Sequence, residues 1–107
     1  MSKSGAEYPE VIDYLTEKDG VCSLYIVQSM PLDDELTLKL QEKINNYLAF
    51  ALDGQLANEY PDMAGMRVQI KLELQYPPEG VAAEFIEKVA PHVEAEGIGF
   101  HVQVGSE

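Results

Sequence analysis

Residues 67–76 have the sequence RVQIKLELQY, in which apolar and polar side chains alternate without interruption. Because successive side chains of a β-strand point to opposite faces, this pattern predicts a strand with one apolar and one polar face. Pro77 and Pro78 follow directly and end the strand, since proline has no N–H to donate to a neighbouring strand. A strand of this kind is typical of a sheet that is covered on one side.

The segment before this strand predicts a long helix over residues 33–53. Its apolar side chains recur at helical spacing and form one stripe. Asp33 or Asp34 can cap the first turn, where a negative charge is favourable. Gly54 stands where a left-handed residue commonly ends a helix.

The segment after the strand predicts a second helix over residues 79–96, ended by Gly97. Pro91 lies inside it, and we expect a kink or a restart there, because proline removes one helical hydrogen bond and clashes with the preceding turn. Residues 98–104 alternate again and predict a further strand.

Residues 11–17 and 21–28 predict an antiparallel hairpin around Asp19 and Gly20. The resulting order is ββαβαβ. It predicts an α+β fold, namely a two-layer sandwich in which a four-stranded mixed sheet carries two helices on one face. We expect one domain over residues 1–107, with a flexible lead-in (1–9) and a flexible tail (105–107).

The charge of the chain narrows the classes of partner. Its 107 residues include 7 basic and 19 acidic ones, which gives a formal net charge of −12. Nucleic acids and anionic membranes bind clustered lysine and arginine, and the sequence has no such cluster. We therefore expect neither as a partner. The acidic residues either keep the chain soluble or present an acidic face to a basic protein.

The sequence also predicts a cytoplasmic location. Residues 1–10 are polar and lack the apolar stretch of a signal peptide. No window is apolar enough to span a membrane. Cys22 is the single cysteine and cannot form a disulfide within the chain, which fits a reducing compartment.

A longer pattern resembles that of a known family. Residues 40–50 (LQEKINNYLAF) are followed by Gly54-Gln55-Leu56 and by Tyr60-Pro61. This succession resembles the LQEK-hydrophobic-N-x-Y-L-x-F, G-x-L and Y-P pattern of a family of short bacterial proteins that is known as a domain of unknown function. The resemblance covers roughly residues 12–100 and implies one bacterial cytoplasmic domain. It implies no activity, substrate or catalytic residue.

The residues that carry chemistry form no familiar motif. His92 and His101 lie on different predicted elements, so the spacing of metal ligands does not occur. Cys22 lies in an apolar run and is expected to be a buried, inert thiol. Glycine-rich phosphate loops and dinucleotide fingerprints do not occur either. We therefore predict no catalytic residue, no metal and no cofactor, and a protein that is not an enzyme.

The predicted strand 21–28 is apolar on both faces, with Cys22, Leu24 and Ile26 on one and Val21, Tyr25 and Val27 on the other. A strand that is exposed to water on one face does not need this composition. We therefore expect part of the outer sheet face to be covered by the N-terminal segment, a second copy of the chain or another protein. The candidate partner surface consists of Tyr25, Val27, Arg67, Lys71 and His101.

A second candidate site lies between the end of the first helix and the loop 55–66. This candidate polar pocket is lined by Lys43, Asn46, Tyr47 and Tyr60. The alternative is structural: the Asn45 amide and the two tyrosine hydroxyls satisfy buried polar groups near a tight turn.

Three functions follow as hypotheses. The leading one is a non-enzymatic protein-interaction module or homodimer that uses the outer sheet face. The first alternative is a small-molecule-binding protein or minor enzyme that uses the polar pocket. The second is an acidic, immunity-type protein that neutralises a basic toxin, for which electrostatic attraction would speed association.

Overall fold

The computed structural model describes residues 12–63 and 65–105. Its strands form one sheet in the order β1-β2-β3-β4. β1 and β2 pair as an antiparallel hairpin, whereas β2, β3 and β4 run parallel. The strands are β1 (Tyr14–Lys18), β2 (Val21–Gln28), β3 (Arg67–Leu74) and β4 (Gly99–Val104). The predicted α+β class and the four-stranded mixed sheet are confirmed.

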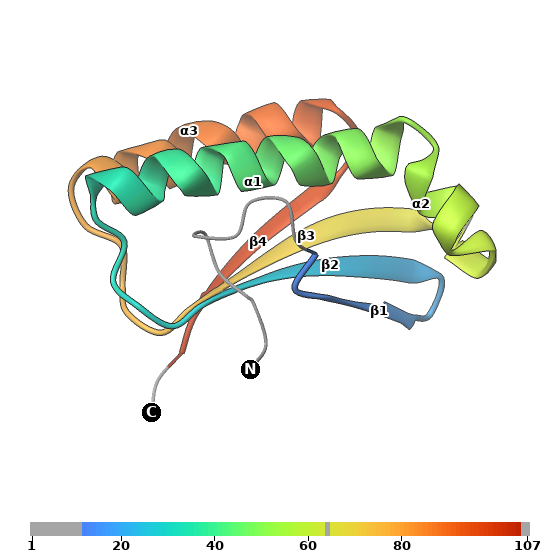
Figure 1. Cartoon of the computed structure of the whole chain (residues 1–107), viewed down its shortest axis with the longest axis horizontal. Helices are drawn as coiled ribbons and strands as arrows, with labels where there is room; N and C mark the ends of the chain where they lie inside the picture. Colours follow the sequence, from blue (N-terminus) through green and yellow to red (C-terminus); the bar gives the residue numbers. More distant parts are fainter. Residues whose placement is uncertain (1–11, 64, 106–107) are drawn as a thin grey trace.

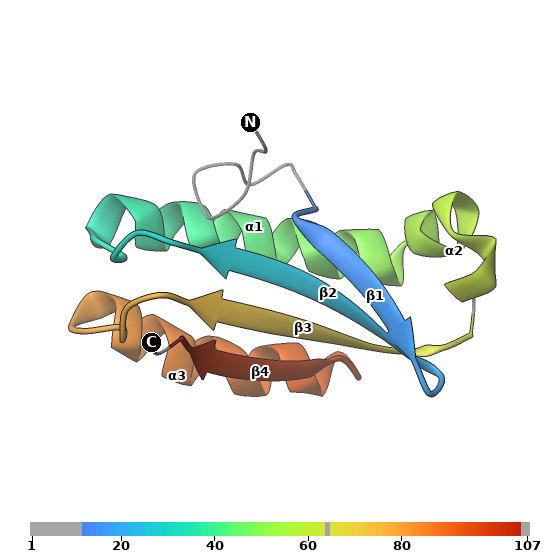
Figure 2. The same ribbon diagram turned by 90° about the horizontal axis from the view of Figure 1, so that it is seen from below.

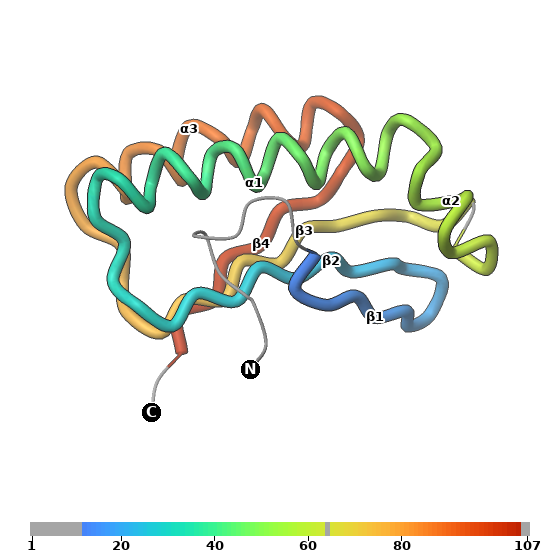
Figure 3. The backbone as a smooth tube through the Cα atoms, viewed as in Figure 1, coloured from blue at the N-terminus to red at the C-terminus, as the bar shows by residue number. Residues whose placement is uncertain are grey.

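The two long helices, α1 (Asp34–Leu52) and α3 (Val81–Ala95), lie on the same side of the sheet, as predicted (Figure 1). Figure 2 shows the opposite face of the sheet, which carries no helix. The short helix α2 (Gln55–Glu59) and a 3₁₀ turn (Pro61–Met63) lie beside one end of the sheet. Figure 3 shows that the connections from β2 to β3 and from β3 to β4 both pass over the helical side.

The core lies between the two long helices and the inner face of the sheet. Its fully buried side chains include Cys22, Leu24, Ile26, Ile70 and Leu72 from the strands, Leu40, Ile44 and Tyr47 from α1, and Val93 from α3. These strand residues occupy every second position of β2 and β3. The alternation in the sequence therefore identified the inner face correctly.

The ends of α1 follow the local rules of helix capping. The Asp33 carboxylate accepts a hydrogen bond from the Leu36 N–H at 2.8 Å, which satisfies one of the donors left free in the first turn. Gly54 follows the last turn with φ +86°, a left-handed conformation that glycine adopts without steric cost. The predicted limits of this helix are confirmed to within one residue.

Replacing Asp33 with alanine should lower the free energy of unfolding by about 0.5–2 kcal/mol, because the Leu36 N–H loses its acceptor. Urea unfolding followed by circular dichroism measures this change. Asp34→Ala is the matched control, since Asp34 is exposed and lies one position further into the helix. An equal loss in both variants would contradict the assignment of Asp33 as the cap.

α3 runs without interruption across Pro91, so of the two expected outcomes the restart does not occur. Pro91 and Glu87 are both exposed. The Glu87 carbonyl, which loses its helical N–H partner, can therefore be hydrated, and this lowers the cost of proline at this position.

The first strand begins later than predicted, at Tyr14 rather than residue 11. Asp13 and Ile12 precede it without strand structure. The expected flexible lead-in lies outside the described residues, as do the last two residues of the expected tail. Gly105, the first residue of that tail, donates its N–H to the Leu74 carbonyl.

Candidate functional site

The register of the sheet aligns one row of side chains across the face without helices. Tyr25 on β2 is paired with Lys71 on β3, and Lys71 is paired with His101 on β4. Tyr14 extends the row from β1, with its ring centroid 4.3 Å from that of Tyr25 and the two planes 9° apart. The Lys71 ammonium lies 5.8 Å from the centroid of the Tyr25 ring, within the range of a cation–π interaction.

The structure brings all five residues of the candidate partner surface to this outer face. Arg67 lies opposite Val21 at one end, and Val27 lies opposite Glu73 towards the other. Arg67 and His101 are exposed, whereas Tyr25, Val27 and Lys71 are half-buried.

β1 covers part of the outer face, which the sequence did not predict. This strand twists away from the helices, towards the outer face (Figures 1 and 2). The Tyr14 ring then stacks on Tyr25. The Tyr14 side chain is still 47% exposed. Partial desolvation, and next the negative charge of Glu73, raise the pKa of its hydroxyl. Residues 1–11 of the N-terminal segment, which was expected to cover this face, lie outside the described residues.

A shallow groove follows β3 and β4 on the outer face. It consists of three depressions of about 240, 420 and 200 Å³. Gln69 and His101 line both the first and the second depression, and Glu73 and Gln103 line both the second and the third. The shared residues make the three depressions one continuous feature, which we call the outer groove.

The charge of this face differs from that of the whole chain. On the described strands its side chains include three basic ones, Lys18, Arg67 and Lys71, and one acidic one, Glu73. The chain as a whole has a net charge of −12. The outer face is therefore a locally basic region on an acidic protein.

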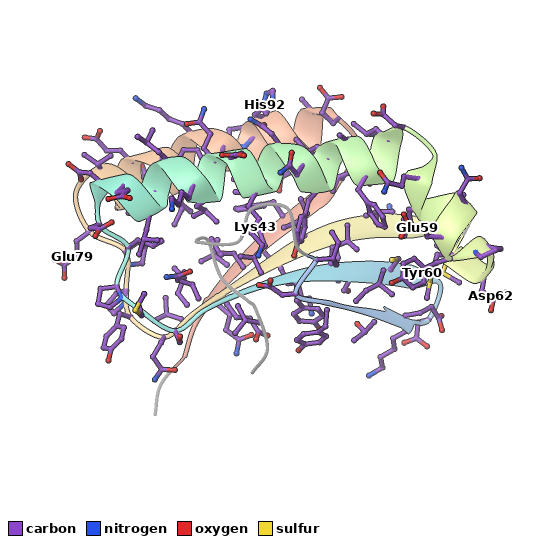
Figure 4. All side chains as sticks on the ribbon, in the orientation of Figure 1. Lys43, Glu59, Tyr60, Asp62, Glu79 and His92 are labelled. Atoms are coloured by element: carbon purple, nitrogen blue, oxygen red, sulfur yellow. The ribbon has the colours of Figure 1, made fainter. Side chains whose placement is uncertain are left out.

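The candidate polar pocket is arranged differently from the hypothesis, because Lys43 lies in the interior between α1 and the sheet (Figure 4). Its ammonium contacts Asp13 Oδ1 at 2.6 Å, and the side chains of Lys43 and Asp13 are 0% and 1% exposed. Asp13 was not among the predicted site residues.

Tyr47 completes this buried cluster of Asp13, Lys43 and Tyr47. Its hydroxyl accepts a hydrogen bond from the Asp13 N–H at 2.9 Å and donates one to the Tyr25 carbonyl at 2.7 Å. Asp13 Oδ2 accepts the Val27 N–H at 2.8 Å. The cluster thus joins α1, β2 and the residue before β1, and the side chain of Asp13 replaces strand pairing at the position where β1 was expected to continue.

Burial raises the pKa of the Tyr47 hydroxyl. The hydrogen bond from the Asp13 N–H lowers this pKa by less, and the negative charge of Asp13, the smallest of the three effects, raises it. The hydroxyl therefore stays protonated at neutral pH and keeps its role as donor. The contacts of Tyr47 thus fit the structural alternative, in which its hydroxyl satisfies buried polar groups.

The other residues of the polar pocket hypothesis lie apart. Asn46 and Tyr47 line an open depression of about 420 Å³ beside α2, but Lys43 and Tyr60 do not line it. Tyr60 (labelled in Figure 4) is 41% exposed, and its ring and that of Phe50 lie at 72° to each other with centroids 6.4 Å apart. Asn45 is exposed on α1, so the expectation that it satisfies a buried polar group is wrong.

The nucleophile and metal candidates are also separated. Burial, and next the charge of Glu17, raise the pKa of the Cys22 thiol. His92 lies on the side of α3 that faces away from the sheet (Figure 4), whereas His101 lies on the outer sheet face. Within residues 12–63 and 65–105, no three His, Cys, Asp or Glu side chains lie close enough together to hold a metal ion. None of the helices described is long and apolar enough to cross a membrane.

Comparison with known proteins gives two matches. Residues 5–106 match the model of DUF6572, a family of unknown function. The ATP synthase subunit delta of Chloroherpeton thalassium (strain ATCC 35110 / GB-78) is 36% identical over 74 residues, which are 64% of this chain and 40% of that protein. The chain thus spans less than half the length of this curated relative. No solved structure matches the chain.

Proposed function

The chain belongs to this family of unknown function, and we propose that it is a non-enzymatic protein-binding module whose outer groove receives an extended segment of another protein. The observation that carries the proposal is the groove itself, which follows two neighbouring strands on the face without helices. Four of the five candidate residues line it, namely Val27, Arg67, Lys71 and His101.

The polar groups of the groove are available to a partner. Within the part of the chain that the structure describes, the side chains of Arg67 and His101 form no ion pair or hydrogen bond. The Lys71 ammonium lies over the Tyr25 ring and forms no hydrogen bond or ion pair within the described residues, so it can donate to an acceptor of the partner. Half-buried Tyr25 supplies apolar area beside these donors, and aromatic and arginine side chains together are typical of protein interfaces.

The shape of the groove favours a polypeptide over a small molecule. Sites for small molecules enclose most of the ligand surface. The outer groove is instead open, and its three parts extend along β3 and β4. An extended segment of a protein can contact all three parts at once.

Charge favours a different protein over a second copy of this chain. A symmetric dimer through the outer face would bring two locally basic surfaces together, and it would join two chains that each carry a net charge of −12. An acidic segment of another protein would instead find opposite charges in the groove.

The alternative functions have less support. The ammonium of Lys43 and the hydroxyl of Tyr47 are engaged inside the fold, so the polar pocket offers few of its expected groups to a small molecule. The raised pKa of Cys22 keeps its sulfur in the thiol form, which is a poor nucleophile. The hypothesis that the chain neutralises a basic toxin stays a prediction that rests on the net charge alone.

The curated relative agrees with a binding role. That protein is, by its name, a subunit of ATP synthase, and a subunit acts in contact with other proteins.

Site-specific photo-crosslinking in the source cells tests the proposal. Gln103→p-benzoylphenylalanine places the crosslinker in the groove, and Leu38→p-benzoylphenylalanine, at a 67% exposed position of α1, is the matched control. We expect position 103, but not position 38, to crosslink one protein of a different mass, which peptide mass spectrometry identifies. With that protein purified, Lys71→Glu should weaken binding about tenfold or more, whereas Lys88→Glu on α3 should not change it.

Three results would overturn the proposal. A crosslinked species of twice the mass of this chain would assign the groove to a second copy. The same products from positions 38 and 103, or none from position 103, would show that the groove is not a docking surface.

A further inference from the structure

The first depression of the outer groove has a composition of its own. It has a volume of about 240 Å³ and is lined by Val21, Arg67, Val68, Gln69, Gly97, Gly99 and His101. Two of these side chains, Arg67 and His101, are basic, and none is acidic. Arg67 comes two residues before Gln69 on β3, and His101 comes two residues after Gly99 on β4, so the pair Gln69–Gly99 lies between them.

The depression exists because Gly99 has no side chain. A Cβ atom at this position would lie 3.2 Å from the Cβ of Gln69 and 3.6 Å from Nε2 of His101. The Gln69 side chain is held in place by a hydrogen bond of 2.7 Å from its Nε2 to the Ser23 hydroxyl. The floor of the depression is therefore preformed, with an imidazole nitrogen at its edge.

The chemistry of the two basic side chains points to a carboxylate ligand. A guanidinium presents a planar fork of N–H donors that matches the two oxygens of a carboxylate. An imidazole adds a further donor. Because neither side chain is engaged within the described residues, both can turn towards a ligand above Gly99.

We infer that this depression binds the carboxylate of an aspartate or glutamate side chain in the segment that docks in the outer groove. The inference rests on the proposed function and names the chemical group that the partner must present. We call this depression the carboxylate pocket.

The position of Glu73 gives the groove a direction. Glu73 and Gln103 line its third depression, at the opposite end from the carboxylate pocket. A docked segment with its acidic residue over Glu73 would meet a like charge, which disfavours the reversed orientation. The acidic residue of the partner is therefore expected at the Arg67 end.

The net charge of the chain does not prevent this contact. At physiological ionic strength, interactions between exposed charges are screened beyond about 8 Å. Arg67 lines the pocket and no acidic side chain does, so the nearest charge inside it is positive.

Peptide display on the full chain tests the inference. Peptides of twelve random residues are selected for binding to the wild-type protein. Those that bind the Lys71→Glu variant more weakly are kept. We expect these peptides to carry Asp or Glu at one fixed position. A selected peptide whose acidic residue is replaced by the corresponding amide should bind the wild-type protein about 10- to 100-fold more weakly. The unchanged peptide should bind the Arg67→Gln variant more weakly by the same factor.

Two further variants serve as controls. Lys88→Gln removes an exposed positive charge on α3 and should leave the affinity unchanged. Gly99→Val fills the pocket without changing a charge and should weaken binding as Arg67→Gln does, with its folding checked by circular dichroism.

The outcomes separate the two proposals. Peptides that bind the groove without preference for an acid, and with unchanged affinity for Arg67→Gln, would overturn the carboxylate pocket and leave the protein-binding function in place. A selection that yields no peptide whose binding Lys71→Glu weakens would overturn the proposed function itself.

Discussion

Replacing Lys43 with methionine should destabilise the fold by about 3–5 kcal/mol, because the change removes the ammonium that neutralises a buried carboxylate. The side chains of Lys43 and Asp13 are 0% and 1% exposed, and their contact is 2.6 Å. Taking an ion from water into a protein interior costs several kcal/mol unless a partner of opposite charge offsets it. Native domains of this size are stable by only about 5–15 kcal/mol, so much of the stability would be lost.

Urea unfolding measures this effect, and two variants make it specific. Lys88→Met removes an exposed ammonium of α3 and should change the unfolding free energy by no more than about 0.5 kcal/mol. Adding Asp13→Asn to Lys43→Met removes the buried charge and should recover part of the loss. A Lys43→Met variant as stable as Lys88→Met would contradict a structural role for Lys43 and would return it to the candidate polar pocket.

Replacing Tyr47 with phenylalanine should lower the free energy of unfolding by about 1–3 kcal/mol. The change deletes the hydroxyl, so the Asp13 N–H and the Tyr25 carbonyl each lose their hydrogen bond to it. The ring itself stays in the core, so packing is little changed. Denaturant unfolding again gives the number, and Tyr76→Phe at a half-exposed position is the control. Unchanged stability combined with loss of a ligand would instead support a binding role for Tyr47.

The raised pKa of Tyr47 adds a test at high pH. In the unfolded chain the hydroxyl ionises near pH 10, whereas in the folded chain it stays protonated to higher pH. The unfolded state therefore binds fewer protons above pH 10, and the stabilising contribution of Tyr47 is lost as pH rises from there towards its folded-state pKa. Tyr47→Phe should show a shallower loss of stability than the wild type in this range.

The parts of the fold that depend on neighbours in sequence were predictable. The alternation of residues 67–76 and the apolar stripe of α1 report directly which side chains are buried. The cap at Asp33 and the left-handed Gly54 involve only a few consecutive residues. Such local signals determine where elements lie and which face they bury.

The buried cluster could not be predicted in full, because it joins residues that are 30 and 34 positions apart in the sequence. One signal was present: Lys43 lies beside Ile44 and four residues before Tyr47, on the apolar side of the helix. A lysine at such a position needs an acidic partner, but the sequence offers 19 acidic residues and does not say which. The late start of β1 has the same origin, because Asp13 uses its side chain where the prediction assumed strand pairing.

The outer groove was predictable only in part. Alternation placed Tyr25, Lys71 and His101 on the outer face, since each lies at an outward position of its own strand. The carboxylate pocket requires the pairing of β3 with β4, which puts Gly99 opposite Gln69. Strand order and register are set by tertiary packing, and the sequence left them open.

Mapping the binding surface by NMR tests the central claim most directly. Amide signals of the labelled chain are recorded while the purified partner found by the crosslinker at position 103 is added. Binding in the outer groove predicts the largest shifts at Gln69, Lys71, His101 and Gln103, with none on the exposed sides of α1 and α3. Shifts centred on the acidic helices, or around Asn46 beside α2, would contradict the account.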